Sequence, residues 1–260
     1  MELIRKIVKV GNSAGVVLPR EWLNGTARVE LVKKPLDINK DILEILEPYL
    51  EDVIGVYLTG SYARGEERKN SDVDVLVITN KISKKIESGK YNIIMVNEKD
   101  LMEHVNKIAL PLMPMIVEAK SFINSNLLRQ ISEKIQITKQ NVRPIIELAK
   151  SALKINRSFL DLDKELGQYT GTAVAYSLIL NLRSLYLINC LRRNKKWSSK
   201  ELKSIIKRVA GSLILYEGYI RNKNDEKPRE DIPINEAEKL YAYVDNEIKE
   251  VEKWLRGKKD

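Results

Sequence analysis

Two aspartates separated by one residue are the side chains of this sequence best suited to metal chemistry. Asp72 and Asp74 stand at the start of the apolar run 75–78, and residues i and i+2 of a strand point to the same face. Two adjacent carboxylates repel each other and are costly to keep ionised without a cation. Proteins hold Mg²⁺ with one or two carboxylates and the substrate phosphates. The pair therefore predicts a magnesium site at a strand start, or else two exposed aspartates that follow a surface turn.

A glycine–serine pair precedes the aspartates and ends another apolar run, 53–58. Gly60 allows the backbone to approach a phosphate closely, and Ser61 adds a hydroxyl and an N–H group to an anion-binding nest. Ser71, directly before the aspartates, is a further nucleotide-binding candidate. Arg64 is either a triphosphate contact or a solvated side chain. Together these residues predict a site for a metal and a nucleoside triphosphate (NTP), with ATP expected as the NTP.

The whole stretch GSYARGEERKNSDVDVLVIT, residues 60–79, resembles the polymerase-β-like nucleotidyltransferase superfamily, whose signature is GS followed by DxD. Within it the stretch is most similar to the minimal and antibiotic-type nucleotidyltransferases. The resemblance implies that Gly60 and Ser61 hold the triphosphate and that Asp72 and Asp74 bind Mg²⁺ or Mn²⁺. It implies transfer of a nucleoside monophosphate from an NTP to a hydroxyl or amine acceptor, with pyrophosphate leaving.

A third carboxylate usually accompanies the pair in that superfamily, on the strand after the DxD strand. Here the corresponding run is 91–96, and Asn92 stands where an acid is expected. Asparagine ligates a metal weakly and cannot act as a base. Glu118 is the best substitute, as a catalytic residue that completes the metal site or deprotonates the acceptor. The alternative for Glu118 is an acid that stabilises a helix N-terminus.

The composition favours a folded protein with anionic partners. The chain has 260 residues, 43% of them hydrophobic, and 45 Lys and Arg against 36 Asp and Glu, an excess of 9. That excess favours nucleic acid or nucleotide partners, or else reflects the Lys/Glu-rich surface of a thermophile. No uninterrupted apolar segment reaches 18 residues and no signal-peptide core is present, so neither a membrane span nor secretion is expected. The single cysteine, Cys190, excludes an internal disulfide, and the expected location is cytoplasmic.

Residues 1–34 form a separate element built of two apolar runs around a Gly-Asn-Ser turn. The string KIVKVGNSAGVVLPREWL…ARVELV resembles the AbrB/MazE/SpoVT swapped-hairpin DNA-binding family. The resemblance implies a dimer in which the strands of two chains interlace. A segment this short cannot bury a core alone, so it should pair with another copy or pack on the rest of the chain. With the resemblance, a homodimer is expected. The segment has seven basic and three acidic residues, which suits phosphate contacts.

The side chains expected to contact duplex DNA are polar or basic and lie on the strands or the turn of this prefix. They are Arg5, Lys9, Asn12 and Ser13. The alternative is a prefix that dimerises without binding DNA.

Apolar periodicity divides the chain into three parts, 1–36, 37–126 and an α-helical domain over 127–260. The two resemblances imply that the first is an AbrB-like swapped hairpin and the second a nucleotidyltransferase core. The fold class is α/β (α+β), with a mixed sheet in the core and an α-helical bundle after it. Residues 35–39 are expected to be a linker, and 115–119 a strand or an extended segment. The expected strands and helices are strands 28–33, 53–58, 73–78 and 91–96, and helices 41–50, 101–109, 127–135, 143–162, 165–194, 199–222 and 235–256.

The expected helix 165–194 carries a stripe of three tyrosines and an arginine that can stack a base or form the edge of a core. The stripe consists of Tyr169, Tyr176, Arg183 and Tyr186. His104, the one histidine, has no visible catalytic partner. A second functional hypothesis is a DNA-binding regulator or toxin–antitoxin component whose transferase core only senses nucleotide.

Overall fold

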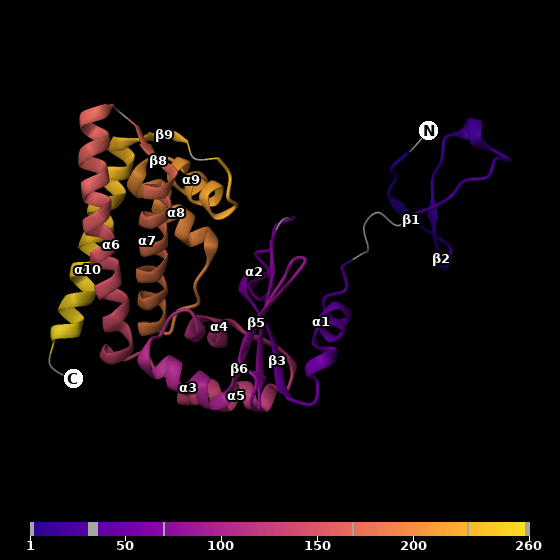
Figure 1. Cartoon of the computed structure of the whole chain (residues 1–260), viewed down its shortest axis with the longest axis horizontal. Helices are drawn as coiled ribbons and strands as arrows, with labels where there is room; N and C mark the ends of the chain where they lie inside the picture. Colours follow the sequence, from indigo (N-terminus) through magenta and orange to yellow (C-terminus); the bar gives the residue numbers. More distant parts are fainter. Residues whose placement is uncertain (1–2, 31–35, 70, 168, 228, 258–260) are drawn as a thin grey trace. The chain divides into compact units, whose positions relative to one another are not determined.

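The computed structural model describes residues 3–30, 36–69, 71–167, 169–227 and 229–257. It divides into two compact units, Met1–Asp37 and Ile38–Asp260, and both are visible in Figure 1.

The first unit contains one β-hairpin. Strands β1 (Ile7–Val10) and β2 (Ser13–Val16) pair antiparallel around Gly11, whose φ of 58° suits a tight turn. A single 3₁₀ turn, η1 (Arg20–Trp22), follows. The strand expected over 28–33 is absent at 28–30, and 31–33 lie outside the described residues. A strand needs a hydrogen-bonded neighbour, and the described part of this chain offers none there.

The apolar side chains of this unit are largely exposed. Ile4, Val17, Leu23 and Val29 are each between 68% and 75% exposed. Burying such side chains is the main favourable term in folding, so the hairpin unit lacks a core of its own.

The second unit is built on a mixed five-stranded sheet with the order β5-β6-β4-β3-β7. Strands β4 and β6 are parallel, and the other neighbours are antiparallel. The predicted mixed sheet is confirmed. The strands are β3 (Val53–Thr59), β4 (Val73–Thr79), β5 (Lys84–Ser88), β6 (Tyr91–Asn97) and β7 (Lys120–Ile123).

The period of two along β4 decides where the aspartates point. Val73, Val75 and Val77 belong to the cluster on the face covered by α1 (Ile38–Leu46). Leu76 and Ile78 belong to the larger cluster on the other face, which also contains residues of the helices that follow β6. Asp74 is two residues before Leu76, so both side chains lie on the same face of the sheet, the face toward the helical part of the chain.

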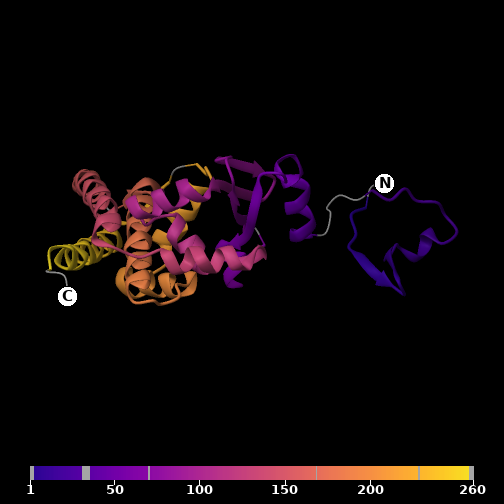
Figure 2. The ribbon, with the colours of Figure 1, turned by 90° about the horizontal axis from the view of Figure 1, so that it is seen from below.

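Besides α1, four helices of the described residues lie next to the sheet, and five more form a bundle beyond it (Figures 1 and 2). The first four are α2 (Gly60–Arg64), α3 (Glu98–Lys107), α4 (Leu112–Glu118) and α5 (Ser125–Lys134); the bundle contains α6 (Lys139–Leu166), α7 (Thr172–Arg192), α8 (Ser199–Ala210), α9 (Ile214–Lys223) and α10 (Ile234–Arg256). One hydrophobic cluster runs from Tyr57 in the sheet to Val251 in α10.

Three predicted elements are wrong in type or extent. Residues 115–118 were expected as a strand or an extended segment but belong to helix α4. The helix can include Pro114 because this proline lies in the first turn of α4, where a missing N–H is tolerated. The helix expected over 165–194 begins only at Thr172, after the short strand β8 (Tyr169–Gly171), which pairs with β9 (Glu230–Pro233). The helix expected over 199–222 is split into α8 and α9 at Gly211, which has a φ of 107°.

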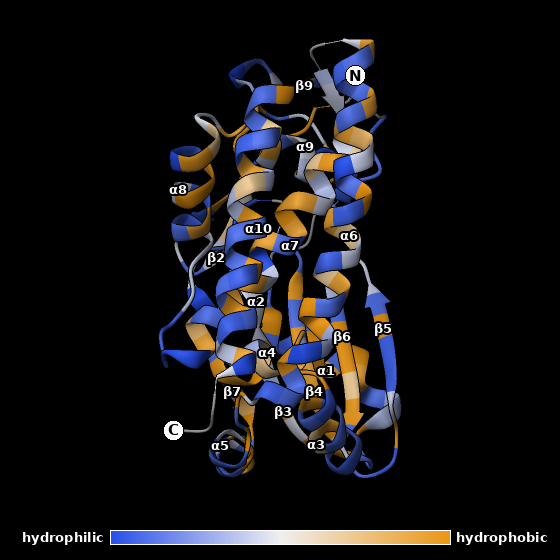
Figure 3. Cartoon of the chain, turned by 90° about the vertical axis from the view of Figure 1, so that its left-hand side faces the viewer, coloured by the Kyte–Doolittle hydropathy of each residue, from blue (hydrophilic) through white to orange (hydrophobic). Residues whose placement is uncertain are grey.

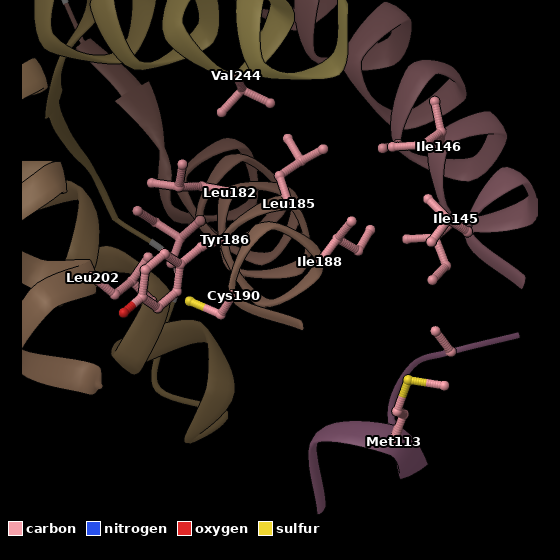
Figure 4. Packing of buried hydrophobic residues seen from close by; sticks show 14 of the residues in the cluster. Met113, Ile145, Ile146, Leu182, Leu185, Tyr186, Ile188, Cys190, Leu202 and Val244 are labelled. Atoms are coloured by element: carbon pink, nitrogen blue, oxygen red, sulfur yellow. The ribbon is translucent and has the colours of Figure 1, made fainter. Parts of the chain in front are cut away.

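Helix α7 is the centre of the bundle. Its residues Leu182, Leu185 and Ile188 lie between neighbours from other helices, including Ile146 of α6 and Val244 of α10 (Figure 4). By length and composition α7 could cross a membrane, but 61% of its most apolar window is buried inside the protein. A helix that is apolar all round fits the middle of a bundle, and colouring by hydropathy shows the mainly polar outer faces of the surrounding helices (Figure 3).

Candidate functional site

The Gly-Ser turn lies directly against the second aspartate. Thr59, the last residue of β3, pairs with Asp74 in β4, and its hydroxyl donates to the Asp74 carbonyl at 3.2 Å. Gly60 has a φ of 67°, and a Cβ on it would lie 2.3 Å from Asp74 Oδ2. Only glycine fits this backbone and this approach. The turn and the carboxylate, 14 residues apart in sequence, therefore form one surface.

The two aspartates differ in environment. Asp74 is mostly buried, and this burial, with repulsion from Asp72, raises the pKa of its carboxyl against the lowering effect of Asn92. Asp72 is more exposed and lies 3.8 Å from Lys223 Nζ of α9. The charge of Lys223 also opposes the rise in the pKa of Asp74.

Asn92 occupies the position on β6 directly beside Asp74, where the sequence places the missing third acid. Its Nδ2 donates to Asp74 Oδ1 at 3.1 Å, and its Oδ1 is buried without a hydrogen-bond partner. No group of three or more His, Cys, Asp or Glu side chains suited to a metal occurs among the described residues. Two carboxylates beside an orphaned amide oxygen give a hard oxygen donor set, which fits Mg²⁺ completed by substrate phosphates.

Glu118, the sequence candidate for the third acid, has both carboxylate oxygens engaged. Gly60 N–H donates to Oε1 at 2.7 Å, and Arg64 Nη1 lies 2.5 Å from Oε2. Burial raises the pKa of Glu118, against the lowering effects of Arg64, the Gly60 N–H and Arg183. Glu118 ends α4 instead of starting a helix, which contradicts its alternative role at an N-terminus. In this geometry it holds the Gly-Ser turn and the Arg64 side chain.

Arg64 is not solvated, which contradicts one of its two predicted roles. Its side chain is 13% exposed, and its guanidinium lies 3.6 Å from the Trp197 ring centroid. Its Nε donates to Glu66 Oε2 at 3.0 Å. Arg64 therefore joins α2 to α4 and to the segment before α8.

Glu66 extends this junction to the helical part. It accepts the Ser198 hydroxyl at 2.5 Å and the Ser199 N–H at 3.0 Å, at the N-terminus of α8. Although burial acts in the opposite direction, these bonds and Arg64 lower the pKa of Glu66 from 4.5 to about 2. A carboxylate at a helix N-terminus is stabilising, so the junction is strongest with Glu66 ionised.

Glu66→Gln should weaken this junction and change the response of the protein to acid. Because the folded pKa of about 2 lies below the ordinary 4.5, ionised Glu66 stabilises the fold above pH 4.5, and this contribution disappears as the pH falls toward 2. We expect the variant to lose about 1–3 kcal/mol of unfolding free energy at neutral pH, and the difference from wild type to shrink in acid. Denaturant titrations between pH 7 and pH 3 measure it. Glu67→Gln, an exposed neighbour, is the control, and equal losses in both variants would contradict the junction.

The helical part presents cations and tyrosines toward the aspartates. Arg183 of α7 lowers the pKa of both Asp74 and Glu118. Lys203 of α8 lies 4.7 Å from the Tyr216 ring centroid. The Tyr216 ring lies 5.8 Å from that of Tyr219.

The predicted tyrosine stripe is only partly assembled. Tyr176 stacks on Tyr219 at 5.3 Å. Tyr186 is buried and donates to Glu201, while Tyr169 is in β8 and 55% exposed. Because the helix begins after Tyr169, the four residues do not share one face.

The remaining predicted residues are placed as follows. The Ser71 hydroxyl accepts the Arg68 N–H at 2.8 Å and so shapes the loop before Asp72. Ser61 is half-buried in α2, and His104 is exposed on α3. The four DNA candidates are all exposed in the hairpin unit: Arg5, Lys9, Asn12 and Ser13.

Several site residues could not be found from the sequence. Glu66, Trp197, Lys203, Tyr216 and Lys223 belong to no local motif. They reach the site only because the bundle packs beside the sheet, and no spacing rule relates them to the aspartates.

A protein-family model matches the part of the chain that contains this site. Residues 39–147 match the family model described as a nucleotidyltransferase domain. The Gly-Ser turn, both aspartates, Asn92 and Glu118 all lie within the matched residues. The search of curated proteins found no relative.

Two solved structures are similar to this chain at low identity. One is a nucleotidyltransferase-like protein from Exiguobacterium sibiricum, with 11% identity, a TM-score of 0.36, and coverage of 82% of this chain and 75% of that one. The other is spectinomycin adenyltransferase AAD(9) from Enterococcus faecialis with ATP and spectinomycin, with 16% identity, a TM-score of 0.43, and coverage of 81% and 97%.

Proposed function

We propose that this protein is an enzyme that transfers a nucleoside monophosphate from an NTP to an acceptor and releases pyrophosphate. The observation that carries the proposal is the packing of Gly60 against Asp74, at a distance that excludes any Cβ. It brings a backbone turn able to approach a phosphate beside a pair of acids able to hold a cation. Nucleotidyl transfer needs both at the same phosphate.

In the proposed reaction Gly60 and Ser61 bind the triphosphate, and Asp72 and Asp74 would hold Mg²⁺ or Mn²⁺. A divalent ion at that position neutralises phosphate charge and aligns the attacking and leaving oxygens. Lys223, 3.8 Å from Asp72, and Arg183 add positive charge on the helical side, where negative charge accumulates as pyrophosphate leaves.

The test is direct measurement of binding and turnover with the full chain. Calorimetry with a non-hydrolysable NTP, with and without Mg²⁺, should show metal-dependent binding. Incubation with each NTP and an acceptor should release pyrophosphate. Absence of metal-dependent binding of every NTP would overturn the proposal.

A second candidate function is a DNA-binding regulator or toxin–antitoxin component whose transferase core only senses nucleotide. Asn92 in the third-acid position is the observation that favours it, since an amide cannot accept the acceptor's proton. Metal-dependent NTP binding with no pyrophosphate release for any acceptor, together with specific DNA binding, would select this candidate.

For the hairpin unit we propose a homodimer that binds duplex DNA. The proposal is supported by the exposed apolar side chains, which a second copy would cover, and by the basic excess of residues 1–34. Arg5, Lys9, Asn12 and Ser13 are all exposed and are the proposed DNA contacts.

Deleting residues 1–37 should abolish DNA binding and weaken the dimer without affecting NTP binding, because the second unit has its own core. If about four phosphates are neutralised per dimer, log K for wild type should fall against log[salt] with a slope near −3.6, from about −0.9 per phosphate. Salt-dependent fluorescence anisotropy and sedimentation measure the two effects.

The matched control is the double variant Arg5→Ala, Lys9→Ala. It should stay dimeric while losing DNA affinity, because it removes charge and no apolar surface. A truncated protein that still retards DNA would contradict the role of the hairpin.

A further inference from the structure

We propose that the acceptor reacts through an oxygen that already carries negative charge, on a phosphate or a carboxylate, bound by Lys203, Arg183 and Arg68 around Tyr216. This inference rests on the proposed transfer and narrows its acceptor. It replaces the neutral hydroxyl or amine that the sequence resemblance implies.

The first argument is that the site offers no free base for a neutral acceptor. The position beside Asp74 holds an amide, Asn92, which itself donates to that aspartate. Both oxygens of Glu118 are bound by Gly60 and Arg64. A hydroxyl or ammonium nucleophile must lose a proton during attack, and this normally requires a positioned base. An anionic oxygen needs none.

Glu66, the other acid that binds Arg64, is also engaged. One of its oxygens accepts the Ser198 hydroxyl, and the other accepts the Ser199 N–H and Arg64 Nε. Asp72 and Asp74 are required for the metal. Thus the four carboxylates of Asp72, Asp74, Glu118 and Glu66 are already engaged, and none of them is left to take a proton from the acceptor.

The second argument is a group of cations around Tyr216, one of which, Arg183, also acts electrostatically on Asp74. Arg183 acts electrostatically on both Asp74 and Tyr216, and Arg68 also acts on Tyr216. Lys203 lies over the Tyr216 ring at 4.7 Å. In the part of the chain that the structure describes, none of these three cations is in an ion pair.

The other acids of the helices around Tyr216 do not balance these charges. Glu201 of α8 is bound to Lys195 and Tyr186, and Asp231 of β9 to Arg221. Glu217 of α9 is exposed. An acceptor with ammonium groups would be repelled here, whereas an anion would gain charge-assisted hydrogen bonds.

Lys223 lies 3.8 Å from Asp72 Oδ2 and is therefore assigned to the triphosphate, whereas Arg183 acts on both Asp74 and Tyr216 and can contact either substrate. Lys203 and Arg68 gather around Tyr216 and remain for the second substrate. The rings of Tyr216 and Tyr219 offer aromatic surface for its organic part.

The chemical step balances without a base. One oxygen of the acceptor forms a new bond to the α-phosphorus, the bond from that phosphorus to the α,β-bridging oxygen breaks, and pyrophosphate leaves with the electron pair. A phosphate acceptor yields a phosphoanhydride and a carboxylate yields an acyl nucleotide. The acceptor releases no proton in either case.

Three matched probes test the charge requirement: phenyl phosphate, benzoate and benzyl alcohol. Each is added to the full chain with Mg²⁺ and the four NTPs, pyrophosphate release is followed, and ³¹P NMR identifies the new linkage. We expect pyrophosphate release with phenyl phosphate or with benzoate, and no release with benzyl alcohol. Which of the two anions reacts shows whether the acceptor is a phosphate or a carboxylate. Calorimetry on the Mg²⁺ complex with a non-hydrolysable NTP should show binding of the same anion.

Substitution of Lys203 locates the subsite. Lys203→Ala should raise KM for the anion about tenfold or more, the loss expected for a charge-assisted hydrogen bond, with KM for the NTP unchanged. Lys203→Arg should restore most of the affinity. Lys207→Ala, an exposed lysine on the same helix, is the control.

Use of benzyl alcohol in preference to the anions would overturn the inference while leaving nucleotidyl transfer intact. Failure of both anions to bind, or no change of their KM in Lys203→Ala, would also overturn it. Absence of metal-dependent NTP binding would instead remove the proposed function on which the inference rests.

Discussion

Replacing both Asp72 and Asp74 by Asn is expected to abolish metal-dependent NTP binding and to lower pyrophosphate release by more than about 10³-fold. The reason is that the two other acids bound at the Gly-Ser turn and Arg64, Glu118 and Glu66, are held by their own partners. Loss of a preorganised charge at a transferring phosphoryl group typically has an effect of this size. Calorimetry and a pyrophosphate assay measure both effects.

The fold should survive this double change. Burial and repulsion raise the pKa of Asp74, so its ionised form destabilises the folded state and a neutral amide of the same shape removes that cost. The unfolding midpoint should therefore be unchanged or slightly higher. Asp161→Asn, at an exposed position on α6, is the matched control. Wild-type NTP affinity in the double variant would show that the metal site lies elsewhere.

Removing the Glu118 carboxylate is expected to have the second largest effect, on stability and on activity together. Glu118→Ala leaves the Arg64 guanidinium, 13% exposed, without its closest partner and leaves the Gly60 N–H unpaired. Breaking a buried ion pair on one side costs about 3–5 kcal/mol. Chemical denaturation measures this loss, and transfer should fall by about 10²-fold or more because the Gly-Ser turn is no longer held.

Glu118→Gln separates the two roles open to this residue. If Glu118 positions the turn, as its contacts favour, the amide keeps an acceptor for Gly60 N–H, NTP affinity and rate fall together, and Arg64→Ala has the same effect. If Glu118 is the base that the sequence resemblance implies, the rate falls by roughly 10²–10⁴-fold with unchanged NTP affinity, and the acid limb of the pH–rate profile disappears. An equal loss in Asn92→Ala with no effect of Glu118→Gln would exclude both roles.

The sequence alone was sufficient for the central sheet and the aspartate pair. The runs 53–58, 73–78 and 91–96 coincide with β3, β4 and β6 to within one residue, because buried strands carry their own apolar signal. The period of two also indicates that Asp72 and Asp74 share a face. The glycine–serine turn was identifiable from residue type, since few residues other than glycine adopt a positive φ.

Where the predictions were wrong, tertiary packing competed with local preference. Helix α4 contains Pro114, and α7 begins only after β8 has paired with β9, a strand about 60 residues later in the chain. By composition alone, α7 fits either a membrane or the core of a helical bundle. The helices that surround it account for its apolar composition (Figure 4). Local sequence contains no information on such distant partners.

The chemistry of the site was decided almost entirely by the tertiary structure. The role of Glu118 depends on Gly60 and Arg64, at separations of 58 and 54 residues, and that of Glu66 on Ser199, at a separation of 133 residues. The cations around Tyr216 come from two helices, α7 and α8, and from the loop before β4. The sequence determined which groups could bind a metal and a triphosphate, because these lie within twenty residues of one another. Which acids remain free, and which charges face the acceptor, depended on long-range packing, because electrostatic environment is set by neighbours in space.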